Sequence, residues 1–196
     1  MKKAITAGVV ALVLSLGLAG LVLAEPFEDA MDAYERGDYA ITIPLLRPMA
    51  DQGNAIAQYV LGVIYKNGQG VPKDDAEAVW WFRKAAEQKY SEAQFSLGSQ
   101  YFRGLGVTKD YVEAARWYRR AAEQGHAAAQ ALLGVMYGKG QGVPKDYVQA
   151  YMWLNLASTG GNNESARTRD SVEHLMTAEQ IAEARKLVRE WKPKSN

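Results

Sequence analysis

The heptapeptide GQGVPKD occurs twice in this chain of 196 residues, at 68–74 and at 140–146, and a near-copy, GLGVTKD, lies midway at 104–110. The three copies begin 36 residues apart, and many other residue types recur in the same register. The recurring positions include Ala57/Ala93/Ala129, Leu61/Leu97/Leu133, Gly62/Gly98/Gly134, Tyr65/Tyr101/Tyr137, Asp74/Asp110/Asp146 and Trp81/Trp117/Trp153. A constant period of this length predicts stacked repeats that bury a continuous core between neighbouring units.

Each unit is expected to contain two helices. In the first, typified by residues 57–66, Ala57, Leu61 and Tyr65 are four residues apart and therefore share one face. A glycine inside a helix costs about 1 kcal/mol relative to alanine, so the recurrence of Gly62 next to this face indicates close approach of the second helix. That second helix is expected to follow Asp74, whose carboxylate can cap the first free N–H groups.

The glycine-rich heptapeptide then reads as a helix end, a chain reversal and a helix start. Its glycines can adopt the positive φ that ends a helix, and Pro72 and Pro144 prevent the helix from continuing. A phosphate-binding loop is the alternative interpretation. The stretch lacks both the preceding strand and the Gly-Lys-Ser/Thr of a P-loop, and its repetition in three equivalent places already explains the glycines.

The unit A-x-x-x-L-G-x-x-Y-x-x-G-x-G-V-x-x-D-x-x-x-A-x-x-W-x-x-x-A-A resembles the SEL-one-like repeat, a relative of the tetratricopeptide repeat. The resemblance implies an all-α fold, a right-handed α–α superhelix (solenoid) of helix-turn-helix repeats. Together with the N-terminal export signal described below, it divides the chain into a signal peptide at 1–24, an N-terminal helix pair at 25–53, three 36-residue repeats at 54–160 and C-terminal capping helices at 161–196.

Proteins similar in this way mostly act as scaffolds or adaptors in exported protein assembly, envelope signalling and host contact. The fold alone does not determine which of these roles a member has. Cysteine-rich relatives are associated with penicillin binding, but they rely on a cysteine pair in each repeat, and this chain has no cysteine.

The N-terminus has the features of an export signal. Lys2 and Lys3 precede an uncharged run from Ala4 to Ala24, and Val22-Leu23-Ala24 suits cleavage after Ala24. This predicts a periplasmic or secreted protein. The run of 21 residues is also long enough to cross a bilayer, so an uncleaved anchor is the alternative and would be the expected membrane contact.

Composition argues against several classes of function. With 23 basic and 22 acidic residues, the chain lacks the basic excess that is typical of nucleic-acid binders. Neither histidine, His126 or His174, has the spacing of a metal site, and His126 is expected in a solvated loop at a unit boundary. We therefore expect no nucleic-acid partner, no metal and no cofactor.

A candidate binding surface lies on the first helix of each unit, opposite the face that packs. First helices typically line the concave side of such arrays, and residue types change there between units while the packing face stays constant. The candidate partner-binding residues are Tyr59, Val63, Lys66, Phe95, Ser99, Phe102 and Val135, with Ala131 and Gly138 as further members in the third unit. Their aromatic character suits a peptide groove, although the same rings could instead pack between neighbouring units.

The tryptophans are expected to divide by their periodicity. Trp81, Trp117 and Trp153 recur at the period and are expected in the core, whereas Trp80 has no equivalent tryptophan and is expected to be partly exposed.

The predicted function is a non-enzymatic, exported adaptor or scaffold that binds a protein or peptide on its concave face in the cell envelope. One alternative is a cell-envelope hydrolase that uses a carboxylate pair with residues such as Glu164 or Asp170. Neither a G-x-S-x-G nor an H-E-x-x-H motif is present. Another alternative is a self-associating structural array.

Overall fold

The computed structural model describes residues 26–159 and 163–194, and all regular structure within them is α-helical. The helices are α1 (residues 26–36), α2 (Tyr39–Asp51), α3 (Ala55–Asn67), α4 (Asp75–Glu87), α5 (Ser91–Arg103), α6 (Tyr111–Glu123), α7 (Ala127–Lys139), α8 (Tyr147–Thr159), α9 (Asn163–Glu173) and α10 (Ala178–Glu190). No helix in these ranges is both long and apolar enough to cross a membrane. The expected signal peptide at 1–24 lies outside the described residues.

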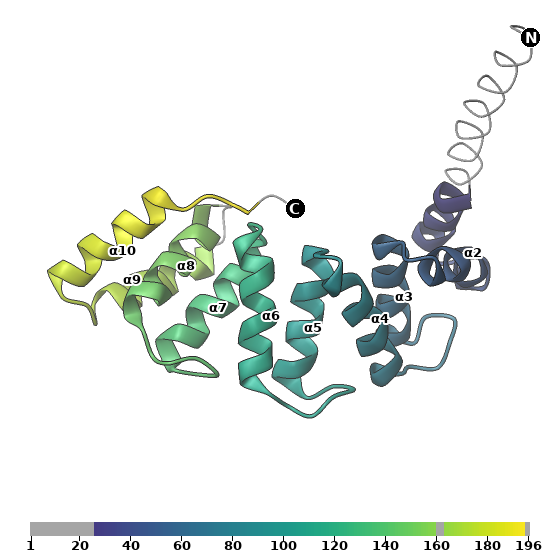
Figure 1. Cartoon of the computed structure of the whole chain (residues 1–196), viewed down its shortest axis with the longest axis horizontal. Coiled ribbons are helices and arrows are strands. Elements are labelled where there is room, and N and C mark those ends of the chain that lie inside the picture. The colour runs from purple at the N-terminus through teal and green to yellow at the C-terminus, as the bar shows by residue number, and fades with distance from the viewer. Residues whose placement is uncertain (1–25, 160–162, 195–196) are drawn as a thin grey trace, which may run out of the picture.

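The helices stand side by side in one row along the long axis of the molecule (Figure 1). Each helix from α2 to α9 packs mainly on its neighbours in the chain, and α8 also packs against α10. The loops that join α3 to α4, α5 to α6 and α7 to α8 lie along the lower edge of the row in this view. The arrangement confirms the all-α array of helix pairs that the 36-residue period predicts.

The glycine inside each first helix permits close packing within the pair. A β-carbon on Gly62 would lie 2.6 Å from the ring of Phe82, and one on Gly98 would lie 2.8 Å from the ring of Tyr118. These distances are too short for any real β-carbon, so a side chain at either position would force the two helices apart. The prediction that these glycines mark a close approach is confirmed.

The recurring heptapeptide ends one helix and starts the next, as predicted. Gly68, Gly104 and Gly140 end their helices in the left-handed conformation, at φ 68°, 71° and 67°. The Asp74 carboxylate accepts hydrogen bonds from the N–H groups of Ala76 and Glu77, each at 2.9 Å. The Thr177 side chain and Gln180 form the reciprocal capping box at the start of α10.

The second glycine of the heptapeptide has a further role that the sequence did not reveal. A β-carbon on Gly106 would collide with the carbonyl of Asp75, and one on Gly142 would collide with the carbonyl of Tyr111. Each turn therefore packs against the start of the second helix in the preceding unit. The heptapeptide recurs because it both reverses the chain and stacks the units.

The periodic tryptophans lie in the core. Trp81, Trp117 and Trp153 are 0%, 4% and 5% exposed, whereas Trp80 is 43% exposed. Both expectations about the tryptophans are confirmed.

A ladder of buried glutamines also joins the units. The Nε2 groups of Gln58, Gln94 and Gln130 donate to the carbonyls of Ala50, Ala86 and Ala122, at 2.8, 3.1 and 3.1 Å. Gln88 and Gln124 in turn donate to the Oε1 atoms of Gln58 and Gln94, each at 2.7 Å. Each buried glutamine thus gives a second hydrogen bond to a carbonyl in the last turn of the preceding helix, which also accepts a main-chain N–H from the residue three positions later.

Candidate functional site

The predicted partner-binding residues fall on three first helices and are all partly exposed. We call them, with Ala131 and Gly138, the first-helix stripe. Tyr59, Val63 and Lys66 lie on α3, Phe95, Ser99 and Phe102 lie on α5, and Ala131, Val135 and Gly138 lie on α7.

In the first unit, Tyr59 packs against rings of its own unit and of the next. Its ring centroid is 5.8 Å from that of Phe82 and 5.3 Å from that of Tyr90, the residue that precedes α5. Burial raises the pKa of the Tyr59 hydroxyl, which therefore stays protonated at physiological pH. Tyr59 is thus an inter-unit packing residue whose remaining surface is open to a partner.

The second unit repeats this arrangement with different residues. Phe95 stacks on His126 with ring centroids 4.7 Å apart, and Phe102 packs edge-on against Tyr111 at 5.1 Å. Ser99 accepts a hydrogen bond from the Tyr118 hydroxyl at 3.1 Å. Phe95 thus packs at the boundary with the next unit, whereas Phe102 packs within its own unit, and partner binding at these residues stays a prediction.

The expectation that His126 lies in a solvated loop is wrong. His126 is half-buried at the N-cap of α7, where its Nδ1 accepts the N–H of Ala129 at 3.2 Å. Asn54 has the equivalent role at α3, with its Oδ1 2.9 Å from the N–H of Ala57. Burial lowers the pKa of His126, and the nearby carboxylate of Glu92 partly opposes this effect. An acceptor side chain is favoured at a helix start, and neutral imidazole supplies one here, whereas Tyr90 at the start of α5 makes no such cap.

In the third unit the stripe opens into a hollow. Two adjoining cavities of about 310 and 190 Å³ lie between α7 and α9 and share Val135, Leu154 and Thr168 in their walls. Ala131 and Gly138 also line them, in the places where α5 carries Phe95 and Phe102. We call this space the α7–α9 hollow. Small side chains leave it open, because they occupy less of the space that rings fill in the second unit.

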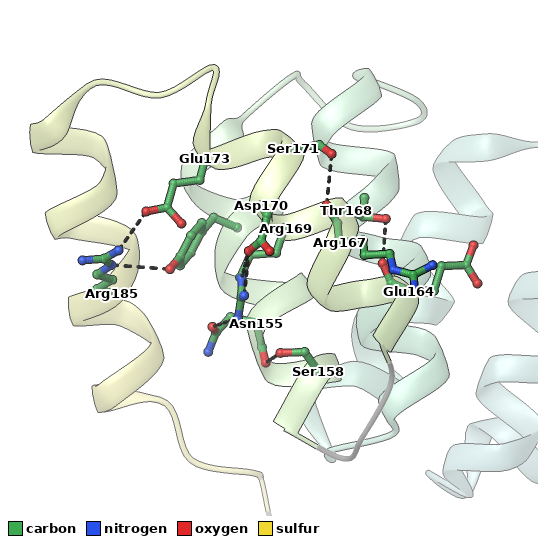
Figure 2. A network of polar contacts seen from close by, with 11 residues as sticks. Asn155, Ser158, Glu164, Arg167, Thr168, Arg169, Asp170, Ser171, Glu173 and Arg185 are labelled. Atoms are coloured by element: carbon green, nitrogen blue, oxygen red, sulfur yellow. Dashed lines mark hydrogen bonds and ion pairs between the residues drawn. The ribbon is translucent and has the colours of Figure 1, made fainter.

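Polar contacts hold the α9 wall of this hollow in place (Figure 2). Arg169 donates to the Asn155 side chain of α8 at 3.0 Å and to the Asp170 carboxylate at 2.6 Å. Arg185 of α10 donates to Glu173 at 2.8 Å and faces the hydroxyl of Tyr151 at 3.4 Å. Helices α9 and α10 are thereby tied to α8 and to one another.

The carboxylates considered for hydrolysis do not form a pair. Glu164 and Asp170 are six residues apart on α9, so they are separated by about 9 Å along the axis and by about 240° around it. Asp170 is ion-paired with Arg169, and Glu164 lies at the rim of the α7–α9 hollow. Within residues 26–159 and 163–194, no group of three or more His, Asp or Glu side chains could hold a metal ion.

Known proteins match both the sequence and the fold. The Sel1 repeat model matches residues 55–90, 91–126 and 127–162. A Sel1 repeat protein from Oxalobacter formigenes is 37% identical, with a TM-score of 0.69, and the match covers 71% of this chain and 57% of that one. A protective antigen present in uropathogenic Escherichia coli strains, which displays an SLR fold, is 38% identical with a TM-score of 0.75, over 86% of this chain and 37% of that one.

The chain therefore spans only part of the length of either solved relative. No curated protein matches it significantly. The three matched repeats make up more than half of the sequence, and their helices pack in consecutive pairs as an SLR fold requires. The chain belongs to the Sel1 repeat family.

Proposed function

We propose that this protein is a non-enzymatic adaptor of the cell envelope that holds a peptide or protein partner on the first-helix stripe. Members of the family are generally non-catalytic scaffolds, and Sel1 repeats typically mediate protein interactions. The observation that carries the proposal is the α7–α9 hollow, a partly enclosed apolar space on the surface that the sequence had indicated for binding.

The chemistry of the hollow favours an aliphatic side chain of an extended or helical peptide. The apolar residues that line it include Ala131, Leu132, Val135 and Leu154. Burial of apolar area contributes about 25 cal/mol per Å² to the free energy of association, so an aliphatic side chain bound here would stabilise the complex. Glu164 and Thr168 at the rim can accept or donate hydrogen bonds to the partner's main chain. An apolar centre with a polar rim is the usual anatomy of a protein interface.

The aromatic members of the stripe would extend this surface along the array. Tyr59, Phe95 and Phe102 are already fixed by neighbouring rings, so binding would cost little further side-chain entropy. Rigid aromatic residues of this kind are common among the residues that dominate binding energy.

Two observations support a location outside the cytoplasm. The N-terminal residues 1–24 have the sequence features of an export signal. One relative is a protective antigen of a pathogenic bacterium, which is consistent with exposure to the host. Fractionation followed by N-terminal sequencing of the recovered protein tests both export and cleavage after Ala24.

The binding proposal is tested by filling the hollow. Val135→Phe adds a ring inside it, and Val112→Phe adds the same ring on α6, where Val112 is an exposed residue outside the stripe. Affinity capture from envelope extract with the unmodified chain and both variants is compared by mass spectrometry. Circular dichroism confirms that each variant is folded.

We expect at least one protein to be captured by the unmodified chain and by the Val112→Phe variant. The Val135→Phe variant should not capture it. A purified partner must then show the same order of affinities in direct titration. Equal retention by all three proteins would exclude the α7–α9 hollow as the binding site.

A further inference from the structure

The C-terminal segment of the chain, residues 191–194, binds in an extended form along the edge of the array opposite the long turns (Figure 1). The N–H of Lys194 donates to the carbonyl of Glu123 at 2.8 Å, and its Nζ lies 2.8 Å from the Glu123 carboxylate. Trp191 packs edge-on against Trp153, with ring centroids 6.4 Å apart. The segment thus crosses the C-terminal end of α6, where helix carbonyls lack partners within the helix.

The same place one unit earlier is open. Glu87, at the end of α4, is 36 residues before Glu123, and in the described part of the chain no donor reaches its carbonyl. A hollow of about 390 Å³ lies beside it, with Gln94, Arg120 and Lys194 among its lining residues. We call this space the Lys89 hollow. Lys194 is one of its lining residues, so the C-terminal segment of the chain ends beside this hollow.

Lys89 distinguishes this hollow from its neighbours. It has a φ of 66°, the one positive φ of a residue other than glycine in the described ranges, and the equivalent positions hold Gly53 and Gly125 at φ 99° and 92°. The left-handed conformation costs an L-residue about 1–2 kcal/mol. Strained backbone positions are concentrated at functional sites, so the conformation of Lys89 indicates a functional role for this hollow.

The charges around the Lys89 hollow favour an acidic ligand. Lys89 and Arg120 have no carboxylate partner among the residues that the structure describes, whereas Lys194 and Glu123 neutralise one another. Arg120 also lies over the Trp117 ring, with its guanidinium carbon 4.4 Å from the ring centroid. The unpaired carboxylate of Glu87 offsets one of these two cations. Because the whole chain carries a formal charge of only +1, attraction of an acidic peptide would report this local excess rather than the net charge.

We propose that the Lys89 hollow binds an extended acidic segment of a partner protein. The partner's main-chain N–H donates to the carbonyl of Glu87, as Lys194 does to Glu123, and its carboxylate lies against Lys89 and Arg120. This surface differs from the first-helix stripe, so the proposal does not depend on the function proposed above and either can fail alone.

The test uses the full chain and two labelled probes, a short peptide of alternating glutamate and serine and its glutamine counterpart. Fluorescence anisotropy measures the affinity of each. Lys89→Gly removes the charge, and glycine tolerates the positive φ, so the substitution suits the backbone at this position. Lys186→Gln, which removes an exposed lysine of α10 outside both proposed surfaces, is the matched control for charge.

We expect the glutamate peptide to bind, the glutamine peptide to bind much more weakly, and Lys89→Gly to weaken glutamate-peptide binding about tenfold. Lys186→Gln should bind it as the unmodified chain does, and the affinity should fall as salt is added. The proposal is overturned if neither probe binds, if both bind equally, or if Lys89→Gly and Lys186→Gln behave alike.

Discussion

Leu154 of α8 packs directly onto the main chain of Gly134 in α7. A β-carbon on Gly134 would lie 2.7 Å from Cγ of Leu154 and 3.1 Å from the carbonyl oxygen of Ala150. We predict that Gly134→Ala destabilises the fold by about 1–3 kcal/mol, because overpacking outweighs the gain of about 1 kcal/mol in helix propensity. Chemical denaturation followed by circular dichroism measures the change.

Gly138, one turn later on the same helix, is the matched control. A β-carbon there would lie 3.7 Å from that of Ala150 and 3.9 Å from Val172, which are ordinary contacts. Gly138→Ala should therefore leave stability unchanged or raise it by about 1 kcal/mol. Equal effects of the two substitutions would show that helix approach is not the reason for the periodic glycine.

The glutamine ladder leads to a second prediction. Gln94→Leu removes two hydrogen bonds, from Gln94 to the Ala86 carbonyl and from Gln124 to Gln94. The Ala86 carbonyl keeps the N–H of Lys89, and the Gln124 amide keeps the Arg120 carbonyl. A hydrogen bond contributes about 0.5–1.5 kcal/mol net, so we expect the free energy of unfolding to fall by about 1–3 kcal/mol for the two. Denaturant titration measures it against Gln141→Leu, a loop glutamine whose side chain makes no hydrogen bond within the described residues. A loss no larger than that of this control would contradict the structural role of the ladder.

The sequence predicted the fold because the residues that fix it are of unusual size or flexibility. Gly62 and Trp81 tolerate few replacements at a close helix crossing or in a core, so their recurrence is easy to interpret. Gln58 recurs with the same period, yet a glutamine in a helix usually indicates a solvated surface. Its partner is a main-chain carbonyl, which no sequence pattern displays.

The candidate site was less accessible to sequence reasoning. Its aromatic residues were identified, but the α7–α9 hollow arises from missing volume at Ala131 and Gly138 and from a wall, α9, that lacks the repeat's residues. A change from ring to small side chain between units is visible in the sequence. Whether such a change opens a cavity depends on how the next helix packs, which only the structure gives.

Backbone strain at Lys89 gives a third prediction. Because its φ of 66° suits glycine better than lysine, Lys89→Gly should raise the free energy of unfolding by about 1 kcal/mol. The reciprocal change, Gly125→Ala at φ 92°, should lower it. Thermal unfolding of both variants tests the pair, and destabilisation by Lys89→Gly would mean that contacts of the lysine side chain outweigh the strain.

His126 links the stability of the array to pH. Its neutral Nδ1 caps α7, and its ring stacks on Phe95. Protonation would remove the acceptor and place a positive charge at the positive end of a helix dipole. This geometry agrees with the burial that lowers the pKa of His126 below its ordinary value of 6.5.

The sign of the pH dependence follows from that lowered pKa. Well above pH 6.5 the imidazole is neutral in both the folded and the unfolded chain, so its full contribution is present. As the pH falls below 6.5, the unfolded chain takes up the proton first, and the free energy of unfolding should decrease until the pH passes the lowered pKa of the folded state. His126→Asn keeps an N-cap acceptor, as Asn54 does in the first unit, but cannot titrate. The difference in free energy of unfolding between the two proteins, measured from pH 8 to pH 5, should change only in the acidic part of this range, and a constant difference would refute a titrating cap.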